Sequence, residues 1–204
     1  MRTGHTLLSA AACALIGSVV INGQTPAAKP APRSPAAAPA ASQYAATATV
    51  MDLMVSMIEP ASKVVFDAVK TVETPTGVQE KAPATDQEWM DLRRNALLMI
   101  ESANLLLMPG RHIAPPQFAK VHNEGELAPA DIEVRVAKDR AAFNRFATAF
   151  RQAAVGALKA AEARKAADFG PVSEAIDSAC ENCHLRFWYP EQEELLKNAP
   201  KPGQ

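Results

Sequence analysis

The sequence predicts an all-α domain, arranged as an up-down-up-down four-helix bundle, over residues 44–204. Four segments of this region place apolar residues three and four positions apart, which is the spacing of one helix face. Pro109-Gly110 and Gly170-Pro171 separate the later segments, and no segment has a convincing strand pattern. A region of this length suits one domain.

Residues 1–23 are expected to be a secretory signal peptide rather than part of the fold. A short basic start is followed by apolar Leu7–Ile21, and small residues near Gly23 suit cleavage. The apolar stretch is shorter than the roughly 20 residues of a membrane-spanning helix, so no integral membrane span is predicted. A lipid anchor on Cys13 is not expected, because no large aliphatic residue stands three positions before it.

Cleavage would leave a nearly neutral chain with two cysteines. Cys180 and Cys183 lie within one short motif, so no structural disulfide framework can form. The formal charge would change from −1 to −2, because residues 1–23 contain one Arg and no Asp or Glu. This charge argues against a nucleic-acid partner.

Residues 24–43 are expected to form a disordered tether. They are mostly proline, alanine and other small residues. Such a segment has too little apolar surface to offset the entropy cost of ordering, and its prolines favour an extended chain.

The first helix is expected at residues 44–73. Its apolar residues recur at alternating steps of four and three, which defines a face that points into the bundle. They are Val50, Met54, Met57, Ala61, Val64 and Ala68. Pro60 should kink or locally loosen this helix, because its ring removes a backbone donor and crowds the preceding turn.

The second helix is expected at residues 85–108. Thr85 and Glu88 form a capping-box pattern at its start, and Pro109-Gly110 stops it. Its inward face comprises Trp89, Leu92, Ala96, Met99, Ala103 and Leu106. The connection that follows, to about Pro129, is long for a small domain, and such loops are usually functional or flexible.

Two further helices are expected after this connection. The third runs from about Pro129 to Arg164, with Val136, Phe143, Phe146, Phe150 and Ala157 on its apolar side. The fourth follows Gly170-Pro171 and ends at Pro190. Its apolar face comprises Val172, Ala175, Ile176, Ala179, Cys180 and Cys183, so we expect both thiols to point into the bundle.

The pentad Cys180-Glu-Asn-Cys183-His184 is the strongest functional signal in the chain. Two cysteines at this spacing lie on one side of a helix, where each thiol can add to a haem vinyl group, and the following His can ligate the iron. The sequence therefore predicts one haem c, attached covalently through Cys180 and Cys183, with His184 as iron ligand. One alternative is a redox-active thiol pair, which is expected within a βαβ unit. Another is a zinc site, for which His112 or His122 would have to supply a further ligand.

These features resemble the cytochrome c′ family, including its low-spin relatives. The resemblance covers about residues 44–190 and is carried by Leu53-Met54, by Asn104–Arg111 and by Cys180–Pro190. It implies a four-helix bundle in which a first-helix residue faces the open side of the iron, and a Met there can make the haem six-coordinate. Matching by position makes Met54 the candidate distal iron ligand. Val50 stands where the family commonly has Arg.

Several alternatives to ligation by Met54 remain. Met51 or Met57 could be the ligand, a loop His could bind instead, or the sixth position could stay open. The methionines could also simply pack against the porphyrin, because Met is a flexible core residue. His112 and His122 are expected to be ordinary surface residues, since both fall in the loop.

Two groups of residues have a functional and an ordinary interpretation. Phe187, Trp188 and Tyr189 could shield a haem edge and lower the local dielectric, or could be core at the end of a helix. Four arginines could pair with haem propionates, because guanidinium binds carboxylates bidentately, although each taken alone is expected to be a solvated surface charge. They are Arg93, Arg94, Arg111 and Arg186.

The predicted function is electron transfer by an exported, periplasmic mono-haem cytochrome, with redox proteins as partners. The alternative is a five-coordinate haem protein that binds small gases such as NO or CO. A carrier needs a closed, six-coordinate iron, whereas a gas binder needs a vacant distal site. No acid, base or nucleophile constellation accompanies the motif, so an enzyme is not expected. The sequence leaves a homodimer open.

Overall fold

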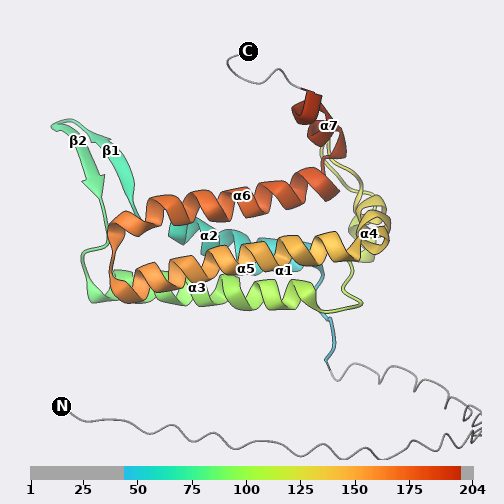
Figure 1. The fold of residues 1–204 in the computed structure, drawn as a ribbon, viewed down its shortest axis with the longest axis horizontal. Coiled ribbons are helices and arrows are strands. Elements are labelled where there is room, and N and C mark those ends of the chain that lie inside the picture. Colours follow the sequence, from blue (N-terminus) through green and yellow to red (C-terminus); the bar gives the residue numbers. More distant parts are fainter. Residues whose placement is uncertain (1–43, 199–204) are drawn as a thin grey trace, which may run out of the picture. The chain divides into compact units, whose positions relative to one another are not determined.

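The structure is a computed structural model that describes residues 44–198. The expected signal peptide, residues 1–23, and the expected tether, residues 24–43, lie outside the described residues. The described region is mostly helical, in agreement with the all-α prediction (Figure 1). No helix in this region is long and apolar enough to cross a membrane.

Long helices surround the core. Their bounds are α1 Val50–Leu53, a π-helix Met54–Ile58, α2 Glu59–Phe66, α3 Asp86–Leu107, α4 Pro129–Lys138, α5 Arg140–Ala163, α6 Phe169–Phe187 and α7 Pro190–Asn198, with short 3-10 turns at Pro116–Phe118 and Ala166–Asp168. Helix α3 packs against α5, α5 packs against α6, and α2 contacts both α3 and α6. The buried apolar side chains of these helices form one cluster.

The expectation of no strand is wrong for residues 70–81. Strand β1, Lys70–Thr74, pairs antiparallel with β2, Gly77–Lys81, and the hairpin projects from the helices (Figure 1). Threonine and valine favour extended backbone, and Gly77 takes a φ of +124° that other residues rarely adopt. The first helical segment, which comprises α1, the π-helix and α2, therefore runs from Val50 to Phe66 instead of from residue 44 to residue 73.

The first helical segment contains a π-turn directly before Glu59 and Pro60. The Glu59 N–H donates to the Met54 carbonyl, five residues back, and this widened turn covers Met54–Ile58. Pro60 has no N–H to continue the regular ladder, so its predicted loosening of the helix is confirmed.

The extra residue in the π-turn changes which side chains face the core. The buried apolar positions of this segment are Val50, Leu53, Ile58, Ala61 and Val65, and Ala68 is buried just after its end. The predicted face was wrong at Val64, which is exposed, while Met54 and Met57 are half-buried. A step of five, from Leu53 to Ile58, replaces a step of three or four.

Helix α3 follows its prediction closely. All six residues of its predicted inward face are buried. At its start, the Thr85 hydroxyl accepts the Glu88 N–H at 3.2 Å, and the Glu88 carboxylate accepts the Thr85 N–H at 2.9 Å, which completes the capping box.

The predicted third helix is two helices in the structure. It breaks at Asp139, which leaves the helical conformation and caps α5 by accepting the Ala142 N–H at 3.1 Å. The break before α6 lies at Arg164, which has a φ of 53°, and not at Gly170-Pro171. Pro171 lies in the first turn of α6, where its missing N–H would have no helical partner in any case.

The apolar face of α6 is close to its prediction, with one exception. Ile176 and Ala179 are buried, whereas Ala175 is exposed, so Ala175 is not part of the face. Helix α6 ends at Phe187, before Pro190, and Pro190 begins α7. Proline suits this first position because its φ is already helical.

Candidate functional site

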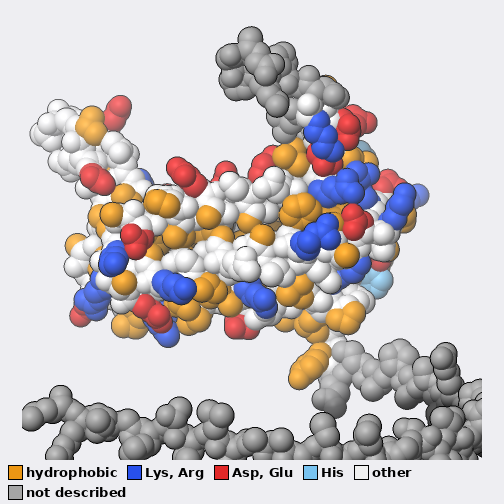
Figure 2. All heavy atoms as spheres, viewed as in Figure 1, with side chains coloured by type: hydrophobic (Ala, Val, Ile, Leu, Met, Phe, Trp, Pro, Cys, Tyr) orange, Lys and Arg blue, Asp and Glu red, His pale blue; other side chains and the backbone are white. Residues whose placement is uncertain are grey.

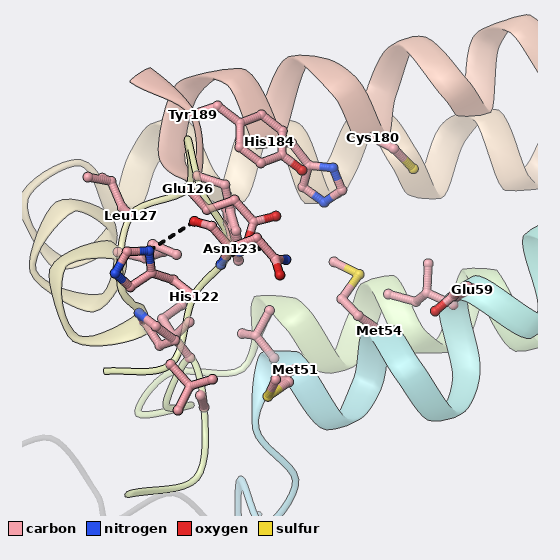
Figure 3. Close-up of a pocket in the computed structure, with 18 of the residues that line it drawn as sticks. Met51, Met54, Glu59, His122, Asn123, Glu126, Leu127, Cys180, His184 and Tyr189 are labelled. Carbon is pink, nitrogen blue, oxygen red and sulfur yellow. Dashed lines mark hydrogen bonds between the residues drawn. The ribbon is translucent and has the colours of Figure 1, made fainter. Parts of the chain in front are cut away.

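A cavity of about 530 Å³ lies between the first helical segment and α6 (Figure 3). Its walls come from α1, the π-helix and α2 on one side, from α6 and the residues after it on the other, and from the long loop and the start of α4. Most of the lining side chains are apolar, and acidic, histidine and other polar side chains lie among them. This size and composition are typical of a cofactor site.

Cys180 and Cys183 lie side by side on the inner side of α6. Cys180 lines the large cavity, and both thiols line an adjoining cavity of about 30 Å³. Both side chains are half-buried and neither is in a disulfide. The prediction that both thiols point toward the interior is confirmed.

Burial makes both thiols weak acids. It raises the pKa of Cys180 to about 11, with help from the nearby charges of Asp177 and Glu181. Burial is the main cause, and the charge of Cys180 the smaller one, that raises the pKa of Cys183 to about 12. Both thiols are therefore protonated at neutral pH, unlike the thiolates of redox-active cysteines, whose pKa is lowered.

His184 projects into the same cavity, one turn along α6 from Cys180 (Figure 3). Its ring packs edge-on against Trp188 at 5.6 Å and against Tyr189 at 5.9 Å between ring centroids. Burial lowers the pKa of His184, although Glu181 and Glu126 act in the opposite direction. Its ring is therefore held in the neutral form, which is the form that binds a metal.

Met54 enters the cavity from the opposite wall. It is the first residue of the π-helix, it lines both cavities, and its side chain points toward His184 (Figure 3). Met51 lies farther from His184 at the rim and is 38% exposed, and Met57 lines neither cavity. Among these three methionines, Met54 alone is placed opposite His184.

The two loop histidines differ in position. His112 is exposed and its Nδ1 lies 2.7 Å from a Glu133 carboxylate oxygen, outside the cavity that contains His184. His122 is also exposed, but it lies at the mouth of that cavity, where its Nδ1 is 2.9 Å from the Asn123 carbonyl. Within residues 44–198, no three His, Cys, Asp or Glu side chains form a group suited to a metal ion.

Three of the four candidate arginines are surface charges. Arg93 pairs with Glu162 at 3.1 Å and Arg94 pairs with Asp91 at 2.7 Å, all in exposed positions. Arg186 pairs with Asp139 at 3.2 Å. None of them lines the cavity.

Arg111 is the exception, because it is buried instead of solvated. Its guanidinium donates to the Leu105 carbonyl at 2.8 Å, to the Ala48 carbonyl and to the Met108 sulfur. It thereby donates to a backbone oxygen at the end of α3 and links the residue Ala48, just before α1, to that end. The sequence position gave no sign of this role.

The three aromatic residues after the motif divide into core and cavity. Phe187 is fully buried and packs edge-on against Phe143 and Phe146, at 5.7 and 6.1 Å between centroids, so it is core. Trp188 and Tyr189 line the cavity beside His184. The Trp188 carbonyl also accepts the Leu127 N–H at 2.9 Å, which fixes the loop to this wall.

Three acidic residues of the cavity were missed by the sequence analysis. Glu59 comes from α2, Glu126 from the loop and Asp177 from α6. Asp177 had a signal, because it precedes Cys180 by three residues and shares its helix face. Glu126 had none, since the path of a loop is not encoded in a periodic pattern.

Comparisons with known proteins add no information about the site. No protein-family model, no curated protein and no solved structure matches this chain. An interpretation of the cavity therefore depends on the motif and on the geometry of the residues around it.

Proposed function

We propose that this chain is an exported c-type cytochrome that carries electrons in the periplasm. It holds one haem covalently through Cys180 and Cys183, His184 is the proximal iron ligand, and Met54 is the distal one. Its fold is then a four-helix bundle formed by the first helical segment, α3, α5 and α6, and it resembles cytochrome c′ in architecture and in the position of the motif.

One observation carries this proposal: the groups of the CxxCH motif meet at one wall of a cavity, and a methionine faces them from the other wall. The thiols occupy the same side of α6 as the imidazole, as attachment at two vinyl groups requires. The cavity volume of about 530 Å³ is within the usual range for cofactor sites.

The residues around the cavity suit electron transfer. A bound haem would supply one-electron exchange at its iron, and methionine as axial ligand raises the reduction potential. Neutral His184 is ready to bind, and Trp188 and Tyr189 hold its ring edge-on. The apolar residues of the wall lower the dielectric around a bound haem, which favours its less charged oxidation state.

The alternative chemistries of the motif have less support. A redox-active thiol pair needs a stabilised thiolate, but burial raises the pKa of both cysteines. A zinc site needs about four ligands, and His112 pairs with Glu133 away from the thiols.

One observation favours gas binding as a second candidate function. Met54 adjoins an apolar cavity of about 30 Å³, which is also lined by Leu106, Phe143 and Phe150. This space is about that of one small molecule. If Met54 packs there without ligating the iron, a diatomic gas has room beside it.

Optical spectra of the purified protein test the two functions against each other. The oxidised and reduced forms are recorded with and without carbon monoxide. A carrier gives low-spin spectra in both states and little change with carbon monoxide. A high-spin spectrum that shifts at once with carbon monoxide would favour gas binding over electron transfer. The absence of any haem spectrum would contradict both functions.

A further inference from the structure

The mouth of the large cavity carries negative charge. Glu59, Glu126 and Asp177 line it, from three different parts of the chain. Among the described residues that line this cavity there is no Lys and no Arg. Glu181 extends the same charge along α6, and it acts with Glu126 on His184 and Tyr189.

Two cations that are close in sequence to cavity residues are paired with acids. Lys63, next to the cavity residue Ser62, pairs with Asp67 at 3.0 Å, and Arg186 pairs with Asp139. Lys120, next to Val121 in the loop, is an exposed exception. In Figure 2 acidic side chains follow the outer edge of α6, while the basic side chains in view lie mainly over α3 and α5 and near α4.

Exposed apolar side chains accompany these carboxylates. Phe66 is 40% exposed and Val121 is 60% exposed, and both line the cavity. An apolar centre with charges around it is the usual composition of a protein interface. Charge complementarity at such a surface raises the association rate more than the affinity, which suits a carrier that must bind and release quickly.

We propose that this acidic mouth, formed by Glu59, Glu126 and Asp177 with Phe66 and Val121, docks a redox partner protein through a Lys- and Arg-rich face. The inference rests on the proposed electron-transfer function and adds the chemistry of the partner. A basic face is complementary to the three carboxylates, and the apolar side chains of the mouth bring the two proteins into contact at the cavity that contains His184.

The test compares two triple variants of the haem-loaded protein. The mouth variant is Glu59→Gln, Glu126→Gln and Asp177→Asn. The control variant is Glu73→Gln, Glu80→Gln and Glu101→Gln, which removes three exposed carboxylates from the hairpin and α3, none of which lines the cavity. Helical circular dichroism and the optical spectrum establish that each variant is folded.

Binding is measured first, by calorimetry with octalysine and with octaglutamate as probes at about 10 mM ionic strength, where screening is weak. We expect the wild type to bind octalysine and not octaglutamate. The mouth variant should bind octalysine roughly tenfold more weakly, and the control variant should stay within about twofold of the wild type. Equal weakening in both variants, or preference for octaglutamate, overturns the proposal.

Electron transfer is measured second, as oxidation of the reduced protein by cationic hexaamminecobalt(III) and by anionic ferricyanide. The mouth variant should react more slowly than wild type with the cation and faster with the anion, and added salt should remove both differences. Unchanged rates contradict docking at this mouth. If the protein carries no haem, the proposed function fails, whereas the peptide result still decides whether the mouth binds a basic chain.

Discussion

His184 of α6 and Met54 of the π-helix face each other across the cavity of about 530 Å³. The two residues are far apart in the sequence, and a distinctive sequence feature lies close to each of them. Cys180 and Cys183 precede His184, and Pro60 follows Met54 after the π-turn. The proposed ligation depends on this relationship.

The change Met54→Ala tests ligation by the thioether. The wild type should show the weak ferric band of iron–sulfur ligation at about 695 nm, and the variant should lack it. Carbon monoxide should bind the reduced variant faster, and the potential should fall, because methionine ligation raises it. Met57→Ala is the matched control and should keep the band, since Met57 lines neither cavity. A wild type without the band would make Met54 a packing residue.

The change Pro60→Ala tests whether the π-turn places Met54. Alanine restores a backbone donor, so the helix can become regular and gain about 1 to 3 kcal/mol of stability. The same change should rotate Met54 away from His184 and weaken the band at about 695 nm. Thermal unfolding and the ferric spectrum measure the two effects. A more stable protein with an undiminished band would mean that the π-turn has no part in positioning Met54.

Side-chain spacing predicted the elements that regular periodicity alone determines. The apolar inward face of α3 was predicted in full, because helical spacing and a capping box define it, whereas the buried Ser102 of the same helix was not predicted. The first segment was predicted less well, since a proline indicates local loosening but not a π-turn. Val64 was therefore assigned to the core although it is exposed.

The candidate site was also predicted only in part. The motif placed Cys180, Cys183 and His184 together because all three lie on one helix. The acids of the mouth and the buried hydrogen bonds of Arg111 depend on how loops and different helices meet. No local pattern records such contacts, so they required the structure.

The change Arg111→Ala should destabilise the protein by about 1 to 3 kcal/mol, because the Ala48 carbonyl loses its side-chain donor and the Leu105 carbonyl keeps only the Met108 N–H. Chemical unfolding followed by circular dichroism measures this loss. Arg93→Ala is the control, and its exposed ion pair with Glu162 should contribute at most about 0.5 kcal/mol. Similar effects for both variants would refute the structural role of Arg111.

Asp139 should make the junction between α4 and α5 sensitive to acid. The Ala142 N–H, followed by Arg186, lowers the pKa of Asp139, so its contribution to stability is present above the usual Asp value and is lost as pH falls through the lowered value. As the pH falls below about 4, the wild type should lose more stability than the Asp139→Asn variant does. Thermal unfolding across this range measures the difference, and parallel curves would exclude the effect.

Covalent attachment of haem is the central claim, and acid-acetone extraction tests it most directly. Extraction should leave the haem on the wild-type polypeptide, because thioether bonds to Cys180 and Cys183 survive it. The double variant Cys180→Ala, Cys183→Ala should retain none, while Ser178→Ala, a change at a nearby exposed position of α6, should retain haem like the wild type. Haem that leaves the wild-type chain during the extraction would contradict the account.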